Sequence, residues 1–283
     1  MPFIGEVEYH FVSDGVYWSD GGGVFGLVPK VVWEKKLPPD ALNRVPLALN
    51  CLLLKTQGKT ILVDTGLGNK LSDRAAETFG LTRSNGGLLD SLSRLGLTPA
   101  DIDIVINTHL HADHCGGNTY LDSETGQLTP TFPKAEYWIQ RRELADASYP
   151  NERTRATYFA DNFVPLQQSE QLKIISGDTE ILGGLKAVIT RGHTRAHQSI
   201  LIESQGEWGF YTADLAVLGY HFERTAWVSA FDLEPLEQIE SKRRWQQWAA
   251  QTGATILFGH DTERPAAHLH RDGRHFKLEA LKG

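Results

Sequence analysis

The stretch His109-Leu110-His111-Ala112-Asp113-His114 places four side chains of metal-ligand type within six residues. Neutral imidazoles and carboxylates suit zinc and related ions, and a hydrolytic site needs several of them at one pocket. In an extended segment, residues 109, 111 and 113 share one face because side chains alternate. If the chain turns helical at Asp113, His114 reaches another side of the same pocket. We therefore expect this stretch to offer two ligands to each of two adjacent metal ions.

The residues around this stretch predict strands that alternate with helices. A short apolar strand over 102–106 leads into His109, and the buried strand before it in the chain exits at Asp64-Thr65-Gly66. Such strand exits are where α/β proteins usually carry functional groups. The same patterns predict a hairpin over 45–61, strands over 135–140, 185–190, 197–202, 208–212 and 254–258, helices over 86–95 and 234–250, and a short turn over 98–101. Strands interleaved with helices indicate sheets covered by helices.

The composition is that of an ordinary globular protein and disfavours several classes. With 41% hydrophobic and 22% charged residues, a chain of 283 residues can bury a large core, and we expect one domain over 1–283. The net charge is −7, and Lys242-Arg243-Arg244 is the nearest approach to a basic cluster, so nucleic-acid binding is disfavoured. No apolar stretch has the length of a membrane span. Two cysteines and the absence of an evident secretory signal predict a reducing, cytoplasmic compartment.

Five short motifs, in a fixed order along the chain, carry a resemblance to a known family. The run 108–117 resembles the signature of the metallo-β-lactamase superfamily. Further motifs of that family match at Leu62-Val63-Asp64-Thr65-Gly66, Gly192-His193-Thr194, Tyr211-Thr212-Ala213-Asp214 and Phe258-Gly259-His260-Asp261. The fold that this resemblance implies is of the α/β (α+β) class: a four-layer αβ/βα sandwich, with two stacked mixed β-sheets flanked by helices.

The resemblance also implies a ligand set for two divalent metal ions. The implied ligands are His109, His111 and His193 for the first ion, Asp113, His114 and His260 for the second, and Asp214 as a bridge between them. Asp64 resembles the aspartate of the family that orients a ligand or the loop beneath it. Zn²⁺ is the expected ion, with Fe, Co and Mn as alternatives.

The activity implied by this ligand set is hydrolysis. Two cations that share a water lower its pKa towards neutrality, and the bridging hydroxide attacks a lactone or a carboxylic ester. One ion can polarise the substrate carbonyl or phosphoryl oxygen and stabilise the developing charge. Asp113 is the candidate for relaying a proton to the leaving group. The expected partner is a small-molecule substrate, and the resemblance implies a homodimer.

Within the superfamily, the chain is most similar to the branch of N-acyl-homoserine lactonases and related organophosphate and aryl-ester hydrolases. The similarity lies in the runs 22–30 (GGVFGLVPK), 192–199 (GHTRAHQS) and 231–235 (FDLEP). In the first run, Phe25 and Leu27 are candidates for contacting an acyl or aryl group, with packing in the core as an equal alternative.

One position departs from that branch. Some of its lactonases have a tyrosine three residues after the bridging aspartate, where this chain has Val217. Tyr220 and His221 follow closely and are candidates for taking over its contact with the substrate. The valine favours, as an alternative main activity, a promiscuous aryl esterase or phosphotriesterase.

Other activities on the same fold agree less well with the sequence. A sulfur dioxygenase uses a single iron and would leave Asp113, His114 and His260 idle. Glyoxalase-type enzymes add a C-terminal glutathione-binding region, for which the 23 residues after His260 are too few. β-Lactam hydrolysis is typical of exported enzymes, and a binding protein would not need the complete ligand set.

The segment 141–171 is the least regular part of the chain. It is polar but holds four aromatic residues, Tyr149, Tyr158, Phe159 and Phe163. It is either an insertion that covers a site or a partner surface, or a surface helix whose aromatic side chains pack in the core.

Overall fold

The computed structural model describes residues 2–281, which form two compact units. Unit 1 holds the chain up to Gly15 together with Leu49–Gly177, and unit 2 holds Val16–Ala48 together with the chain from Asp178 onward. The chain passes from one unit to the other within strands β2 (Val7–Asp20) and β3 (Arg44–Thr56). One domain over 1–283 stays a prediction.

The first of two seven-stranded sheets has the order β1-β2-β3-β4-β5-β8-β9. Its strands β4, β5, β8 and β9 run parallel to one another, whereas β3 and β4 form an antiparallel hairpin. The bounds of its other strands are β1 (Phe3–Ile4), β4 (Lys59–Val63), β5 (Ile104–Ile106), β8 (Glu136–Gln140) and β9 (Leu172–Ile175). A separate two-stranded sheet pairs β6 (Thr119–Leu121) with β7 (Leu128–Pro130).

The second seven-stranded sheet follows the chain order from β10 to β16 and lies within unit 2. All its neighbouring strands are antiparallel except β13 and β14, which run parallel because α9 lies between them in the chain. Its strands are β10 (Thr179–Leu182), β11 (Leu185–Ile189), β12 (Gln198–Ser204), β13 (Glu207–Tyr211), β14 (Thr255–Leu257), β15 (Ala266–Asp272) and β16 (His275–Ala280).

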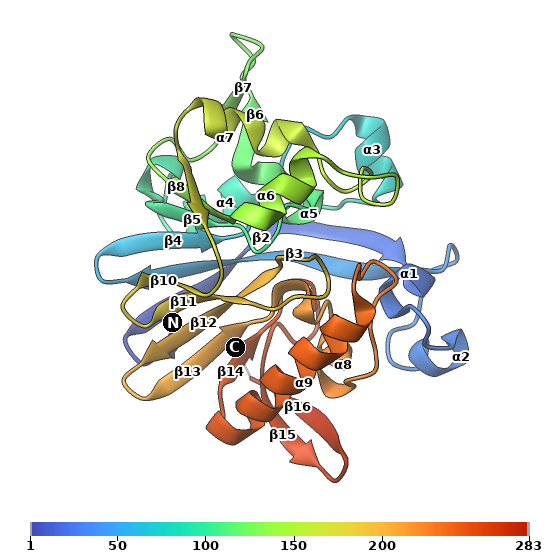
Figure 1. Ribbon diagram of the computed structural model, residues 1–283. Coiled ribbons are helices and arrows are strands. Elements are labelled where there is room, and N and C mark those ends of the chain that lie inside the picture. The colour runs from blue at the N-terminus through green and yellow to red at the C-terminus, as the bar shows by residue number, and fades with distance from the viewer. Residues whose placement is uncertain (1, 282–283) are drawn as a thin grey trace. The chain divides into compact units, whose positions relative to one another are not determined.

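Helices of each unit cover that unit's sheet. In unit 1, α6 packs against β8; in unit 2, α9 packs against β15 and α8 against β16 (Figure 1). The α-helices are α1 (Gly21–Phe25), α2 (Lys30–Trp33), α3 (Asp73–Thr78), α4 (Leu88–Arg94), α5 (Ala112–Cys115), α6 (Arg141–Ser148), α7 (Val164–Gln168), α8 (Gly219–Glu223) and α9 (Pro235–Thr252). Short 3-10 helices cover Pro99–Asp101, Gly116–Asn118, Ala160–Asn162 and Ala213–Leu215.

The core of each unit forms where its helices meet its sheet. In unit 1, Leu88 and Leu92 of α4 pack with Val105 of β5 in one buried cluster. In unit 2, Trp245 of α9 stacks on Phe210 of β13, with the ring centroids 4.3 Å apart. Burial of this apolar surface is the main term that stabilises each unit.

The fold class predicted from the sequence is confirmed: two large mixed sheets are flanked by helices. The hairpin over 45–61, the helix over 86–95 and the helix over 234–250 are present as β3–β4, α4 and α9. Eight further strands were not predicted: β1, β2, β6, β7, β9, β10, β15 and β16. In β2, Ser13-Asp14-Gly15 interrupts the apolar pattern, and in β15 two histidines, an arginine and an aspartate weaken it.

Among the described helices, none is both long enough and apolar enough to cross a membrane.

Candidate metal centre

The four ligand candidates of unit 1 lie together at the end of β5. The chain is extended up to His111 and then forms the single turn of α5, which begins at Ala112, one residue before the predicted point. The ligand atoms of His109 lie within 4.8 Å of those of His111 and of those of His114, and the same limit holds between Asp113 and His114. The imidazole rings of His109 and His114 have centroids 4.1 Å apart. The local chain path therefore gathers all four side chains.

Asp64 fixes this loop from the end of β4. Its carboxylate lies 2.9 Å from Nδ1 of His114 and accepts hydrogen bonds from the backbone N–H and the hydroxyl of Thr108. Asp64 has a φ of 61°, a left-handed conformation that is uncommon for residues other than glycine. With Nδ1 of His114 held by an oxygen, the lone pair of this imidazole lies on Nε2. This geometry fits the orienting role expected of Asp64.

Glu143 is a second support of the loop, and it was not predicted. Its side chain is buried on α6 and accepts a hydrogen bond from the backbone N–H of Leu110, between His109 and His111. The hydroxyl of Tyr158 donates to the same carboxylate oxygen at 2.9 Å. In the segment 141–171, Tyr158 therefore packs in the core next to Leu110, whereas Tyr149 is 89% exposed.

Gly116 and Gly117, which follow the ligand candidates, allow their backbone to lie against the loop after Asp64. A Cβ at Gly116 would lie 2.2 Å from the carbonyl oxygen of Leu67, and one at Gly117 would lie 2.3 Å from that of Thr65. Only residues without a side chain allow this approach. The ammonium of Lys70 donates to the carbonyl oxygens of Gly116 and Thr119, and its burial lowers its pKa to about 8.

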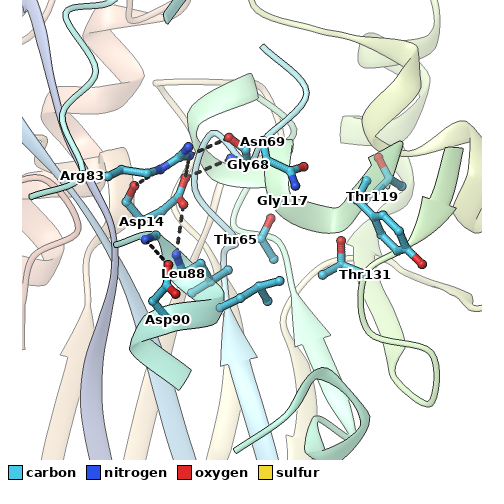
Figure 2. A pocket seen from close by; sticks show the side chains of 13 residues that line it. Asp14, Thr65, Gly68, Asn69, Arg83, Leu88, Asp90, Gly117, Thr119 and Thr131 are labelled. Carbon is cyan, nitrogen blue, oxygen red and sulfur yellow. Dashed lines mark hydrogen bonds and ion pairs between the residues drawn. The ribbon is translucent and has the colours of Figure 1, made fainter. Parts of the chain in front are cut away.

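A pocket of about 200 Å³ lies beside these two loops, and the ion pair of Asp14 and Arg83 lines part of it (Figure 2). Arg83 donates to the carboxylate of Asp14 at 2.8 Å and to the carbonyl oxygen of Gly68 at 2.6 Å. Asp14 in turn accepts from the backbone N–H groups of Gly68 and Leu88. The pair therefore joins β2, the loop after Asp64 and the start of α4.

The three ligand candidates of unit 2 meet at Asp214. Its Oδ2 lies 3.1 Å from Nε2 of His193, and its Oδ1 lies 3.2 Å from Nε2 of His260. Two ligand atoms that share a tetrahedral ion lie about 3.4 Å apart, because each metal–ligand distance is about 2.1 Å. Each carboxylate oxygen thus faces a different imidazole, as expected of a carboxylate that bridges two ions. The donor set and its spacing fit divalent metal ions.

Oxygen atoms also hold the other ring nitrogen of both imidazoles in unit 2. Nδ1 of His193 lies 2.8 Å from the carboxylate of Asp232, and Nδ1 of His260 lies 2.7 Å from the carbonyl oxygen of Ala48. His197 accepts a hydrogen bond from the backbone N–H of Asp214. Asp232 lies in the run 231–235 that was singled out from the sequence, but its contact with His193 was not predicted.

The residues predicted to contact substrate have other neighbours within unit 2. Phe25 is fully buried, stacked on Trp33 and on His221, whereas Leu27 is 96% exposed. Nε2 of His221 lies 3.0 Å from the carbonyl oxygen of Val24, and burial lowers the pKa of this imidazole to about 4, so it is neutral at pH 7. Tyr220 donates to the carbonyl oxygen of Lys36. The surroundings of Phe25 favour the core-packing alternative, and the substrate contacts stay predictions.

Known proteins resemble this chain in sequence and in structure. The sequence profile of the metallo-beta-lactamase superfamily matches residues 44–260. An N-acyl homoserine lactonase of Bacillus cereus is 30% identical over 233 residues, which cover 78% of this chain and 84% of that protein.

Two solved structures extend the similarity to the fold. A probable metal-dependent hydrolase from Staphylococcus aureus superposes with a TM-score of 0.90 at 29% identity, covering 100% of this chain and 99% of that one. An N-acyl homoserine lactone hydrolase, with its product N-hexanoyl-L-homoserine bound at the catalytic metal centre, has a TM-score of 0.69 at 26% identity and covers 90% and 93% of the two chains. The resemblance inferred from the five motifs is thereby confirmed, and this chain belongs to the metallo-beta-lactamase superfamily as one of its hydrolases.

Proposed function

We propose that this protein hydrolyses lactones, N-acyl homoserine lactones among them, and related carboxylic esters with the help of two divalent metal ions. Zn²⁺ is the ion that the nitrogen and oxygen donors suit best, with Fe, Co and Mn as alternatives. The proposed ligands are His109, His111 and His193 for one ion, Asp113, His114 and His260 for the other, and Asp214 for both.

The arrangement around Asp214 is the observation that carries this proposal. Its two carboxylate oxygens face His193 and His260 separately, at 3.1 and 3.2 Å. A site for one ion would need only one of these pairs. In unit 1, four more donors lie close together, which supports a total of seven ligands. This count argues against a sulfur dioxygenase with one iron.

The residues of the chain would orient the ligands and move a proton. When bound, two cations would lower the pKa of a shared water and polarise the carbonyl group of the substrate. Asp64 and Asp232 hold Nδ1 of His114 and His193, so that Nε2 presents its lone pair. Asp113 is more exposed than the other carboxylates here, with 20% of its side chain accessible, and would relay a proton to the leaving alkoxide.

The relatives support lactones as the substrate class. The relative from Bacillus cereus is named an N-acyl homoserine lactonase, and a solved structure with 26% identity holds the product of lactone hydrolysis. Val217 favours a second candidate, the hydrolysis of aryl esters or phosphotriesters. This side chain is buried and apolar, so it offers no hydroxyl to a lactone carbonyl. The hydroxyl of Tyr220, a candidate substitute, donates to Lys36.

The decisive experiment combines metal analysis with a panel of substrates. Purified protein loaded with Zn²⁺ is assayed on N-hexanoyl homoserine lactone, an aryl ester and a phosphotriester, and its metal content is measured on the same sample. We expect about two ions per chain and turnover of the lactone. His193→Ala and His114→Ala should each lose metal and activity.

Two results would overturn the proposal. One iron per chain without turnover of any of the three substrates would exclude a binuclear hydrolase. Two ions with turnover of the phosphotriester but not of the lactone would make the second candidate the main activity. A cytoplasmic location, a homodimer and the absence of nucleic-acid partners stay predictions from the sequence.

A further inference from the structure

Helix α9 buries three polar side chains that lie four residues apart along the chain. Gln238, Lys242 and Gln246 have exposed fractions of 2%, 1% and 0%. A spacing of four residues places them on one face of the helix. Burying a polar group is unfavourable unless it forms hydrogen bonds, and burying an ammonium group is more so. We therefore expect the buried ammonium of Lys242 to have hydrogen-bond acceptors or an opposite charge nearby.

Each of the three side chains donates to the backbone of a different segment in unit 2: a 3-10 helix, helix α8 and the loop after α8. Gln238 donates to the carbonyl oxygens of Asp214 and Leu215, at 2.7 and 3.0 Å. Gln246 donates to the carbonyl oxygen of Phe222 at 2.8 Å. Lys242 donates from Nζ to the carbonyl oxygen of Trp227. The segment held by Gln238 contains the ligand candidate Asp214, and the segment held by Gln246 contains none. The role of Lys242 depends on whether the loop at Trp227 leads to a ligand candidate.

The loop that Lys242 holds leads to Asp232. The carboxylate of Asp232 accepts hydrogen bonds from the backbone N–H and the hydroxyl of Ser229, at 2.9 and 3.0 Å. Its Oδ1 also lies 2.8 Å from Nδ1 of His193. Trp227, Ser229, Asp232 and Lys242 line one small cavity, so the ammonium and the carboxylate share the same surroundings. Lys242 thus supports the start of the loop whose end contacts His193.

The charges of Lys242 and Asp232 also complement each other. Burial lowers the pKa of Lys242 to about 7, and the negative charge of Asp232 acts against this shift. A buried carboxylate and a buried ammonium stabilise each other's charged forms more strongly than they would in water. Removal of the lysine would leave Asp232 without this cation.

We propose that Lys242 is a positioning residue, which holds the loop 227–232 and keeps the carboxylate of Asp232 in place to orient His193. Of the cluster Lys242-Arg243-Arg244 that stands out in the sequence, the lysine alone is buried on the face of α9 that holds the loops. The inference rests on the proposed function in one respect only, that His193 is a metal ligand.

The first test uses the metal-free protein, so that it does not depend on the proposed activity. The imidazole Nδ1 proton of His193 is followed by NMR in protein labelled with ¹⁵N-histidine, with His193→Ala to assign it. We expect a slowly exchanging proton in the unmodified protein and its loss in Lys242→Met. Gln246→Leu is the matched control, because it removes an equally buried polar group from the same face of α9; it should keep the signal.

The second test measures the affinity for Zn²⁺ by competition with a chelator. Loss of a residue that orients a ligand typically weakens metal binding about 10- to 100-fold. We expect a loss of about 10-fold in Lys242→Met, partial recovery in Lys242→Arg, and no change in Gln246→Leu. Asp232→Asn provides the same readout if Lys242→Met yields no folded protein.

The outcomes separate this inference from the proposed function. If Lys242→Met keeps both the Nδ1 proton and the Zn²⁺ affinity, or loses no more than Gln246→Leu does, Lys242 only stabilises the fold and the inference is wrong. If the Nδ1 proton is lost in Lys242→Met but the unmodified protein neither binds two ions nor cleaves the lactone, the proposed function fails and the positioning role stands.

Discussion

Each imidazole of the candidate centre depends on the atom that holds its second nitrogen. His114 and His193 contact the carboxylates of Asp64 and Asp232, whereas His260 contacts the carbonyl oxygen of Ala48. A carboxylate partner raises the basicity of the imidazole more than a carbonyl does, so His114 and His193 should bind a metal ion more strongly than His260 if all three are ligands.

The proton-relay role proposed for Asp113 can be tested separately from its proposed role as a metal ligand. Asp113→Asn keeps an oxygen donor but cannot carry a proton, so we expect kcat for lactones to fall about 100-fold or more while the bound Zn²⁺ is largely retained. Steady-state kinetics and metal analysis of the same preparation measure both effects. Turnover equal to that of the unmodified protein would remove the proton-relay role.

Lys242 should give the stability of the metal-free protein a distinct pH dependence. Its pKa is about 7 in the folded state and about 10.4 in an unfolded chain. Between these values the unfolded state binds more protons, so the free energy of unfolding rises with pH over this window. Asp232 faces the ammonium, and the neutral His221 lies near it.

We expect Lys242→Met to flatten this rise when urea unfolding is measured at several pH values from 7 to 10. Lys70, with a pKa of about 8, contributes in the same direction and remains in the variant. Gln246→Leu should lower the stability without changing the slope. An unchanged slope in Lys242→Met would mean that the lysine is charged throughout this range in the folded protein.

Helix α9 holds the segments that carry His193 and Asp214 in unit 2. Its N-terminal residues pack against the loop that presents His193: Glu234 donates from its N–H to the carbonyl oxygen of Gly192, and Ser241 donates to that of Arg191. Gly253 ends the helix in a left-handed conformation with a φ of 69°. The helix thus covers the second sheet and also supports the loop that carries His193.

Two glycines at the ends of α9 allow a matched comparison. Gly192 has a φ of +147°, and a Cβ added there would lie 2.4 Å from the Cα and 2.5 Å from the backbone nitrogen of Gln238. At Gly253, where φ is +69°, no atom lies within 4 Å of an added Cβ. We expect Gly253→Ala to lower the free energy of unfolding by about 1 kcal/mol and Gly192→Ala by about 3 kcal/mol or more.

Chemical denaturation measures both differences, and Zn²⁺ titration should show weaker binding in Gly192→Ala alone. Equal losses of stability in the two variants would show that the loop at Gly192 can move away from α9.

For the whole molecule, the sequence places four proposed ligands in unit 1 and three in unit 2. An ion that binds only the folded protein stabilises it, by about 2.7 kcal/mol when its free concentration is 100 times its Kd. We expect one such ion to raise the Tm of the chelator-treated protein by about 5 °C at that concentration. Thermal unfolding with and without the ion measures this shift.

Variants from each unit test whether the same ions bind both ligand sets. His109→Ala in unit 1 and His193→Ala in unit 2 should each reduce the shift in Tm. A shift that disappears in His109→Ala but is complete in His193→Ala would mean that the ligands of unit 2 bind none of the stabilising ions.

The class of the fold, the residue types of the proposed ligands and the strand exits that carry them could be predicted from the sequence. These features depend on short-range patterns, such as the six residues 109–114 and the apolar run before Asp64, which the local chain path realises. The groups that support the proposed ligands could not be predicted, because they come from distant parts of the chain. Asp232 reaches His193 across 39 residues, and Glu143 reaches the loop at Leu110 across 33. The tertiary structure also decided that Lys242 is buried while its neighbours in a basic cluster are not. Periodicity predicts which face of a helix is buried, but the partner of a buried charge depends on loops that meet it only when the chain has folded.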